Sequence, residues 1–201
     1  LPRELSLAED GTLRVRPLRE LKGLRFDRVT LFDVILTNPI TGHGDRVPPV
    51  EGPALQRIVE LEGDTLEIHM VVPREQALRK LLGFVLFSNG TGAGLTILLR
   101  PETGTLRVGT SEAPFAVAEL PEGEDVELRI FIDKYLVEVF ANNRQALVAA
   151  HLDRAGGTGL DAFTVGAPAI IERLDIWKLR PTNQGHLDAR RTRIWEPDKQ
   201  V

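Results

Sequence analysis

The stretch 126–144 constrains the fold of this chain more than any other part of the sequence. Apolar residues alternate with mostly polar ones over 126–133, and this period of two is typical of a strand with one buried face. The next run, 135–140, is rich in β-branched and aromatic residues, which favour strands. Asp133-Lys134 breaks the run between these two strands, and Asn142-Asn143 provides a turn after the second, because asparagine tolerates positive φ. The sequence therefore predicts two strands that meet at a tight turn.

Glu138 is the unusual residue of the second predicted strand. A period of two places it on the same strand face as Leu136 and Phe140. An unpaired charge is strongly disfavoured inside a protein, so a buried carboxylate has to be paired or hydrogen-bonded. If that face is covered, we expect Glu138 to have such a partner.

The rest of the chain repeats this pattern of short strands and turns. Turn residues recur about every eight to twelve positions, and long helical patterns are missing. Further strands are predicted at 13–16, 29–37, 55–61, 65–72, 84–87, 95–100, 105–110, 115–119, 145–152, 159–165 and 170–179. The fold class that follows is all-β: a two-sheet antiparallel β-sandwich, concanavalin A-like, with about six strands per sheet.

Three finer expectations concern single elements. Strands 55–61 and 65–72 are expected to form a hairpin across the polar turn 62–64. Good helix formers predict a helix over 73–82. Apolar residues on both faces of 29–37 favour a central strand, or a strand whose outer face is covered.

Composition limits the function classes. The net charge of −4, without a basic stripe, argues against nucleic-acid binding. No apolar run approaches about 18 residues, so no membrane-spanning helix is expected. Cysteine is absent, which excludes disulfides and thiolate metal ligands. We expect no cofactor and no metal, because His43 and Asp45, in a long Gly/Pro-rich loop, are too few ligands for a metal site.

Other catalytic motifs are weak. Glu60, Glu62 and Asp64 alternate as the acids of some sandwich glycosidases do, but the turn at Gly63 would take them off a single strand. The glycine-rich run 90–94 lacks the Lys-Ser/Thr ending of a phosphate-binding loop and precedes a strand. The sequence also has no nucleophile-elbow motif.

Three motifs together carry a resemblance to a known family. They are Asp133 followed by Glu-Val-Phe at 138–140, the passage 1–21 with Pro-Arg-Glu-Leu near its start, and Leu-Asp-Ile-Trp-Lys-Leu at 174–179. In this order and spacing they resemble the C-terminal β-sandwich of glycoside hydrolase family 32, which contains invertases, levanases, inulinases and sucrose-6-phosphate hydrolases. One departure is Tyr135, because the family usually has serine at that position.

The resemblance implies a non-catalytic role for this chain. Family 32 enzymes are retaining glycosidases, which hold two carboxyl groups about 5 Å apart. In the family, those carboxylates come from an N-terminal five-bladed propeller, whose Arg-Asp-Pro and Glu-Cys signatures are missing here. The implied role is to stabilise and abut such a propeller, acting on β-fructosides, as the C-terminal module of a β-fructosidase.

The expected organisation is one sandwich domain over 1–180, followed by a C-terminal extension, 181–201, whose structure the sequence does not define. The chain starts at Leu1-Pro2, without an initiator or signal-like segment, so we expect it to be part of a longer protein. Its partner would be the N-terminal catalytic propeller of that protein. The sequence leaves the compartment and the fructan linkage open.

No catalytic residue is expected within the chain itself. Asp133, Tyr135, Glu138 and Trp195 are the candidates for contact with carbohydrate or with the neighbouring domain. Trp177, on the closing strand, is expected in the core, because a buried aromatic ring contributes a large apolar area.

Two other function classes stay open as alternatives. A lectin-like module that binds fructan or sucrose-like carbohydrate would need exposed aromatic rings, and the aromatic content of 5% argues mildly against it. A structural or oligomerising module would expose an apolar face.

Overall fold

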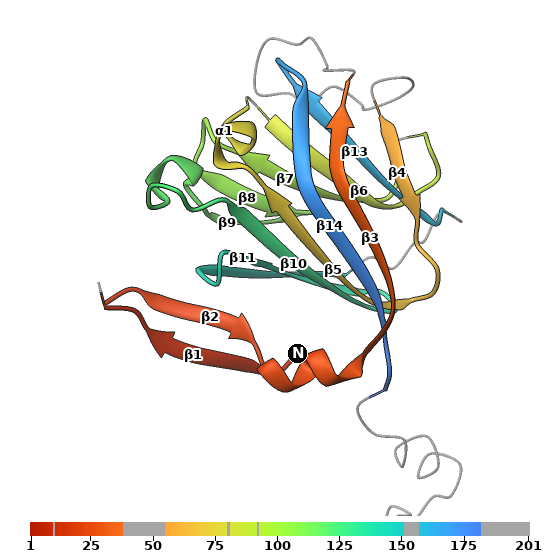
Figure 1. The fold of residues 1–201 in the computed structure, drawn as a ribbon, viewed down its shortest axis with the longest axis horizontal. Coiled ribbons are helices and arrows are strands. Elements are labelled where there is room, and N and C mark those ends of the chain that lie inside the picture. Colours follow the sequence, from red (N-terminus) through yellow and green to blue (C-terminus); the bar gives the residue numbers. More distant parts are fainter. Residues whose placement is uncertain (10, 38–54, 80, 92, 151–156, 182–201) are drawn as a thin grey trace, which may run out of the picture.

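The structure, a computed structural model, describes residues 1–9, 11–37, 55–79, 81–91, 93–150 and 157–181. Most of the described residues lie in two six-stranded antiparallel sheets that pack face to face (Figure 1). This β-sandwich confirms the predicted fold class. Among the described residues, no helix has the length and hydropathy that crossing a bilayer requires.

The first sheet has the strand order β12-β11-β10-β5-β14-β3. Its strands are β3 (Arg25–Leu36), β5 (Thr65–Val72), β10 (Val126–Asp133), β11 (Leu136–Ala141), β12 (Gln145–Ala150) and β14 (Ala169–Leu179). The second sheet has the strand order β4-β13-β6-β7-β8-β9. Its strands are β4 (Gln56–Glu60), β6 (Leu81–Ser88), β7 (Leu95–Arg100), β8 (Thr105–Val108), β9 (Ser111–Pro114) and β13 (Gly159–Val165).

The hairpin predicted over 126–140 is confirmed as β10 and β11. Their register pairs Asp133 with Leu136, so Lys134 and Tyr135 alone form the turn. Lys134 has φ of 56°, the left-handed backbone that a two-residue hairpin turn requires. On its other side, β10 pairs with β5, which places the hairpin well inside the first sheet.

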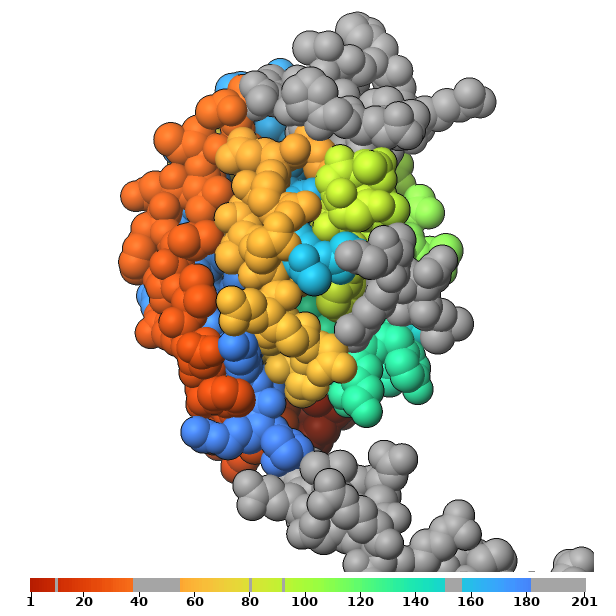
Figure 2. Space-filling view, turned by 90° about the vertical axis from the view of Figure 1, so that its right-hand side faces the viewer, coloured from red at the N-terminus to blue at the C-terminus, as the bar shows by residue number. Residues whose placement is uncertain are grey.

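Strand β3 is an edge strand, not the central strand that its apolar faces predicted, and its outer face leaves Phe32 and Ile35 exposed. β4 is the edge of the other sheet, and the two edges lie side by side (Figure 2). The Gln56 side-chain amide donates a hydrogen bond of 2.8 Å to the Ile35 carbonyl oxygen and joins them. Asp27 and Asp33 adopt positive φ on β3, and such irregularities protect a sheet edge against further pairing.

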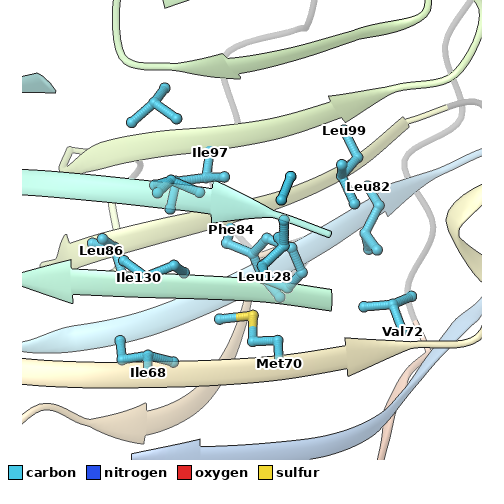
Figure 3. Close-up of a cluster of buried hydrophobic side chains, with 14 of the residues drawn as sticks. Ile68, Met70, Val72, Leu82, Phe84, Leu86, Ile97, Leu99, Leu128 and Ile130 are labelled. Atoms are coloured by element: carbon cyan, nitrogen blue, oxygen red, sulfur yellow. The ribbon is translucent and has the colours of Figure 1, made fainter. Parts of the chain in front are cut away.

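The core lies between the two sheets. Ile68, Met70 and Leu128 of the first sheet face Phe84 and Ile97 of the second (Figure 3). All five side chains are fully buried. The alternation that predicted β10 therefore marks the face that it turns toward the second sheet.

Two expectations about the middle of the chain are wrong. β4 and β5 do not form a hairpin, because β4 pairs with β13 in the second sheet whereas β5 pairs with β10 and β14 in the first. The turn between them carries the chain from one sheet to the other. The helix expected over 73–82 is a single turn, α1 (Arg74–Ala77), since the apolar run Leu81–Ser88 is buried on both faces as β6.

The strand predicted over 115–119 is also wrong. The strand in this region is β9, which ends at Pro114, and Val117–Glu119 forms a short 3₁₀ helix, η3. β9 pairs with β8 at the edge of the second sheet.

The N-terminal residues form a third layer on the outer face of the first sheet. β1 (Arg3–Leu7) and β2 (Leu13–Pro17) make a two-stranded sheet, and a 3₁₀ helix, η1 (Arg19–Leu24), follows them (Figure 1). An apolar cluster joins this layer to β10 and β11, and its buried members are Leu21, Phe131 and Phe140. The outward face of the predicted hairpin is therefore covered.

Candidate functional site

A pocket of about 380 Å³ lies on the outer face of the first sheet, where β10, β11 and β12 meet the start of the N-terminal layer. It is lined by Leu1, Arg3, Phe131, Asp133, Leu136, Glu138 and Val148. Leu136 and Val148 are exposed, so the pocket has an apolar rim around a charged floor. Two of the four predicted site residues, Asp133 and Glu138, meet here.

The charged floor is an ion pair between Arg3 and Glu138. Arg3 donates from Nε to Oε1 of Glu138 at 2.7 Å, and its Nη2 contacts the same oxygen. The backbone nitrogen of Leu1 donates to Oε2 at 2.9 Å. Glu138 is only 6% exposed. These contacts confirm the expectation that a buried carboxylate at this position has partners. The carboxylate of Glu138 is therefore paired on both of its oxygens.

Aromatic packing fixes the ion pair in place. The rings of Phe131 and Phe140 meet edge to face, with centroids 6.0 Å apart. The Arg3 guanidinium lies 5.5 Å from the centroid of the Phe140 ring. Aromatic rings therefore lie directly beside the ion pair, and Phe131 contributes an apolar wall to the pocket.

A second ion-pair cluster lies further along the same outer face. Glu67, on β5, is completely buried between two arginines. Arg25 reaches its two carboxylate oxygens at 2.7 and 2.6 Å, and Arg129 donates twice to Oε1 at 2.9 and 2.6 Å. The outer face of β5 is thus covered by charge pairing and not by another layer of apolar side chains.

Asp175, on β14, is held in a similar way. Its carboxylate accepts from Thr30 Oγ1 at 2.7 Å, from Arg28 Nη2 at 2.6 Å and from Arg173 Nε at 2.8 Å. Burial raises the pKa of Asp175, but these hydrogen bonds and the arginine charges outweigh burial and hold the pKa below its ordinary value of 3.8. The group therefore stays ionised and links β3 to β14.

Trp177 is half-buried on this outer face, so the expectation that it lies in the core is wrong. The guanidinium of Arg25 lies over its ring, 4.0 Å from the centroid, and the guanidinium of Arg28 lies 5.4 Å from the same centroid. Its neighbour Ile176 points inward, to the core. Strand alternation alone cannot show which face is inner when both carry apolar residues.

The other candidates lie apart from the pocket. Tyr135 is 51% exposed in the β10–β11 turn and does not line the pocket. Trp195, and also His43 and Asp45, lie outside the described residues. Glu60 ends β4 and Asp64 precedes β5, so the alternating acids do not share a strand.

Sequence reasoning missed Arg3 and Val148 as pocket residues. Arg3 is 135 positions from Glu138 in the sequence. The sequence indicated only that a buried Glu138 would need a partner, and not that Arg3 would be that partner. Over the part of the chain that the structure describes, no group of three or more histidine and acidic side chains could hold a metal ion.

Comparison with known proteins identifies the family of this fold. The sequence profile described as "Glycosyl hydrolases family 32 C terminal" matches residues 43–178, more than half of the chain. The chain belongs to this family. The resemblance carried by the three sequence motifs is confirmed.

The relatives of this family 32 C-terminal chain are longer proteins. It is 29% identical over 183 residues to raffinose invertase of Escherichia coli, a match that covers 89% of this chain and 34% of that protein. Among solved structures, the exo-inulinase of Aspergillus awamori has a TM-score of 0.64 at 15% identity, covering 90% of this chain and 36% of that one. The sucrose-6-phosphate hydrolase of Lactobacillus gasseri has a TM-score of 0.59 at 19% identity, covering 89% and 33%.

These matches show the fold and how much of each relative this chain corresponds to. At such low identity the solved structures establish the fold alone. The chain spans about a third of the length of the proteins that it matches.

Proposed function

We propose that this chain is the non-catalytic C-terminal module of a β-fructosidase, and that it stabilises and abuts a catalytic propeller that precedes it in the longer protein. One observation carries the proposal: the chain matches the model of a C-terminal module and aligns with only 34% of raffinose invertase. The remaining part of such a protein is where the catalytic carboxylates of a retaining glycosidase would lie.

The chemistry of the pocket supports a supporting role. A retaining glycosidase needs one carboxyl group as an acid, with a raised pKa. In the pocket, the Glu138 carboxylate is occupied by its ion pair with Arg3. Outside the pocket, the pKa of Asp175 is lowered by its partners, and that of Glu127 is lowered by a hydrogen bond with His69. An apolar rim around an ion pair is better suited to contact with another protein domain than to acid catalysis.

The test compares two proteins: this chain alone, and the longer protein read from the complete reading frame. Fructose release from sucrose, raffinose and inulin is measured for both. We expect release by the longer protein and none by the chain. Fructose release by the chain alone, abolished by Glu138→Gln, would overturn the proposal, and so would a reading frame with no catalytic sequence before Leu1.

Carbohydrate binding is the second candidate, because Tyr135 presents an exposed ring in the β10–β11 turn. Aromatic rings that face solvent can stack on sugars. Calorimetric titration of the chain with sucrose, inulin and levan oligosaccharides tests it, with Tyr135→Ala as the variant. Phe32→Ala is the matched control, since that ring is also exposed but lies on the edge strand β3. Saturable heat that Tyr135→Ala alone removes would support binding, whereas flat traces would contradict it.

A further inference from the structure

The β1–β2 hairpin has two chemically different faces. Its register pairs Arg3 with Pro17, Leu5 with Val15, and Leu7 with Leu13. Paired residues of an antiparallel sheet share a face, so these six lie together. The opposite face carries Glu4, Ser6, Arg14 and Arg16. The hairpin is therefore amphipathic.

One end of the apolar face is docked on the sandwich. Pro17 is buried, and Val15 packs against the cluster of Phe131 and Phe140. The backbone nitrogen of Val15 also donates to the Asn143 carbonyl oxygen at 2.8 Å. β2 is thus the strand that faces the sandwich.

The other end of the same face is uncovered. Leu5 is 64% exposed, Leu7 is 74% exposed and Leu13 is 55% exposed. Within the described part of the chain, β1 pairs with β2 and with no other strand. The hairpin therefore presents an apolar face and an open strand edge together.

This combination is unfavourable for a surface that stays in water. A two-stranded sheet is only marginally stable by itself, and an open edge next to apolar side chains is a template for pairing with another strand. Peptide segments that add a strand in this way gain affinity from backbone hydrogen bonds and specificity from alternate side chains.

We propose that β1 is a strand-addition site for the catalytic part of the longer protein. An exposed sheet edge in the part that precedes Leu1 would pair with β1 and lay apolar side chains on Leu5, Leu7 and Leu13. This inference rests on the proposed function and names the surface through which the module holds its partner.

The size of the relatives and the position of β1 favour this occupant. This chain covers 34% of raffinose invertase, so about two thirds of that relative lies outside the match. A preceding domain would belong to the same polypeptide as β1. A covalent link raises the effective concentration of that domain at β1, which favours it over a second copy.

Hydrogen exchange tests the pairing directly. The amides of residues 3–7 are compared in the chain alone and in the longer protein. We expect their exchange to be about a hundredfold slower in the longer protein, because new hydrogen bonds close the free edge. Amides of β10, which is central in its sheet, should be equally protected in both and are the control. Equal exchange of residues 3–7 in both proteins would overturn the inference.

A second copy of the chain is the competing occupant. If it filled the edge, the chain alone would show protection of residues 3–7 that increases with protein concentration, together with a dimer mass. That result would also overturn the inference.

Substitutions test the leucine face independently. Leu7→Lys should lower the unfolding midpoint of the longer protein but not that of the chain alone, where Leu7 is already exposed. Leu78→Lys is the matched control, because Leu78 is also an exposed leucine but follows α1, far from β1 in the fold, and it should leave both midpoints unchanged. Equal effects of the two substitutions in the longer protein would contradict the docking surface.

The two proposals fail separately. If the longer protein releases fructose and is stabilised by the module while residues 3–7 exchange freely, only the strand-addition site is wrong. If the longer protein holds no catalytic domain, the proposed function is wrong, whatever the exchange of β1.

Discussion

Glu138 shows how one charged residue can organise a surface. It lies on the outward face of β11, where the N-terminal layer would otherwise bury an unpaired carboxylate. Arg3 supplies the compensating charge and also covers Phe140. The ion pair therefore fixes the start of the chain against the hairpin at its centre.

Replacement of Glu138 by glutamine should destabilise the chain by about 1–2 kcal/mol, because it leaves the Arg3 guanidinium without its charged partner in a largely covered site. Arg3 keeps about a third of its side-chain surface in water, which moderates the loss. Urea unfolding monitored by fluorescence measures the change. Glu122→Gln, at an exposed turn position, is the control and should be neutral. Equal stability of Glu138→Gln and the parent chain would contradict the structural role of this pair.

Gly83 is a second position where a single residue decides local packing. The ring of Phe163 lies flat against it on the outer face of the second sheet, and an added Cβ would come within 2.3 Å of that ring. Gly83→Ala should therefore cost about 1–3 kcal/mol by overpacking. Gly23→Ala is the matched control, since a Cβ there meets nothing within 4 Å. Thermal unfolding of both variants measures the difference, and a Gly83→Ala midpoint equal to that of Gly23→Ala would refute this packing account.

At the scale of elements, buried carboxylates join the strands of the first sheet across its outer face. Glu67 links β3 to β10 through its two arginines, and Asp175 links β14 to β3 through Thr30 and Arg28. These contacts supplement the backbone pairing of β3, which has a sheet neighbour on one side only.

The Asp175 cluster should make stability depend on pH. Its pKa in the folded chain lies below the ordinary value of 3.8, so its contribution is present above that value and is lost as pH falls through the lower folded pKa. Asp175→Asn should cost about 2 kcal/mol at pH 7, and progressively less as the pH falls below 3.8. Urea unfolding of both proteins from pH 7 to the acid range tests this. A difference that stays constant over that range would be inconsistent with ionisation of Asp175 as the cause.

Local pattern predicted the elements whose partners are close in sequence. β10 and β11 are joined by two residues, so the alternation and its break at Asp133-Lys134 were sufficient. The same signals predicted a hairpin of β4 and β5, which is wrong, because a polar turn looks the same whether the chain stays in one sheet or crosses to the other. The helix formers in 73–82 do not continue the helix, because the residues from Leu81 onward are buried on both faces as β6. This is a tertiary effect that no local pattern contains.

The candidate site was predictable to the same extent. Asp133 and Glu138 lie on one hairpin, so their proximity followed from its register. Arg3 and Val148 come from other elements, and only the fold brings them to the pocket. Tyr135 was a candidate because it interrupts a motif. It is exposed in the β10–β11 turn and does not line the pocket, so its role stays a prediction.

At the scale of the whole molecule, the sandwich combines one large core with an outer face that ion pairs and the N-terminal layer cover. The pocket and the uncovered leucines of β1 lie on that same side of the molecule. A domain held there would gain stability without receiving any catalytic group from this chain.

The half-life of the catalytic part at elevated temperature, with and without this chain, tests the supporting role most directly. The catalytic part is produced alone and as the longer protein, and fructose release is followed after heating. We expect the half-life to be at least about tenfold longer in the longer protein, because contacts with the sandwich slow its unfolding. Equal half-lives, with full activity of the catalytic part alone, would contradict the supporting role that we assign to this chain.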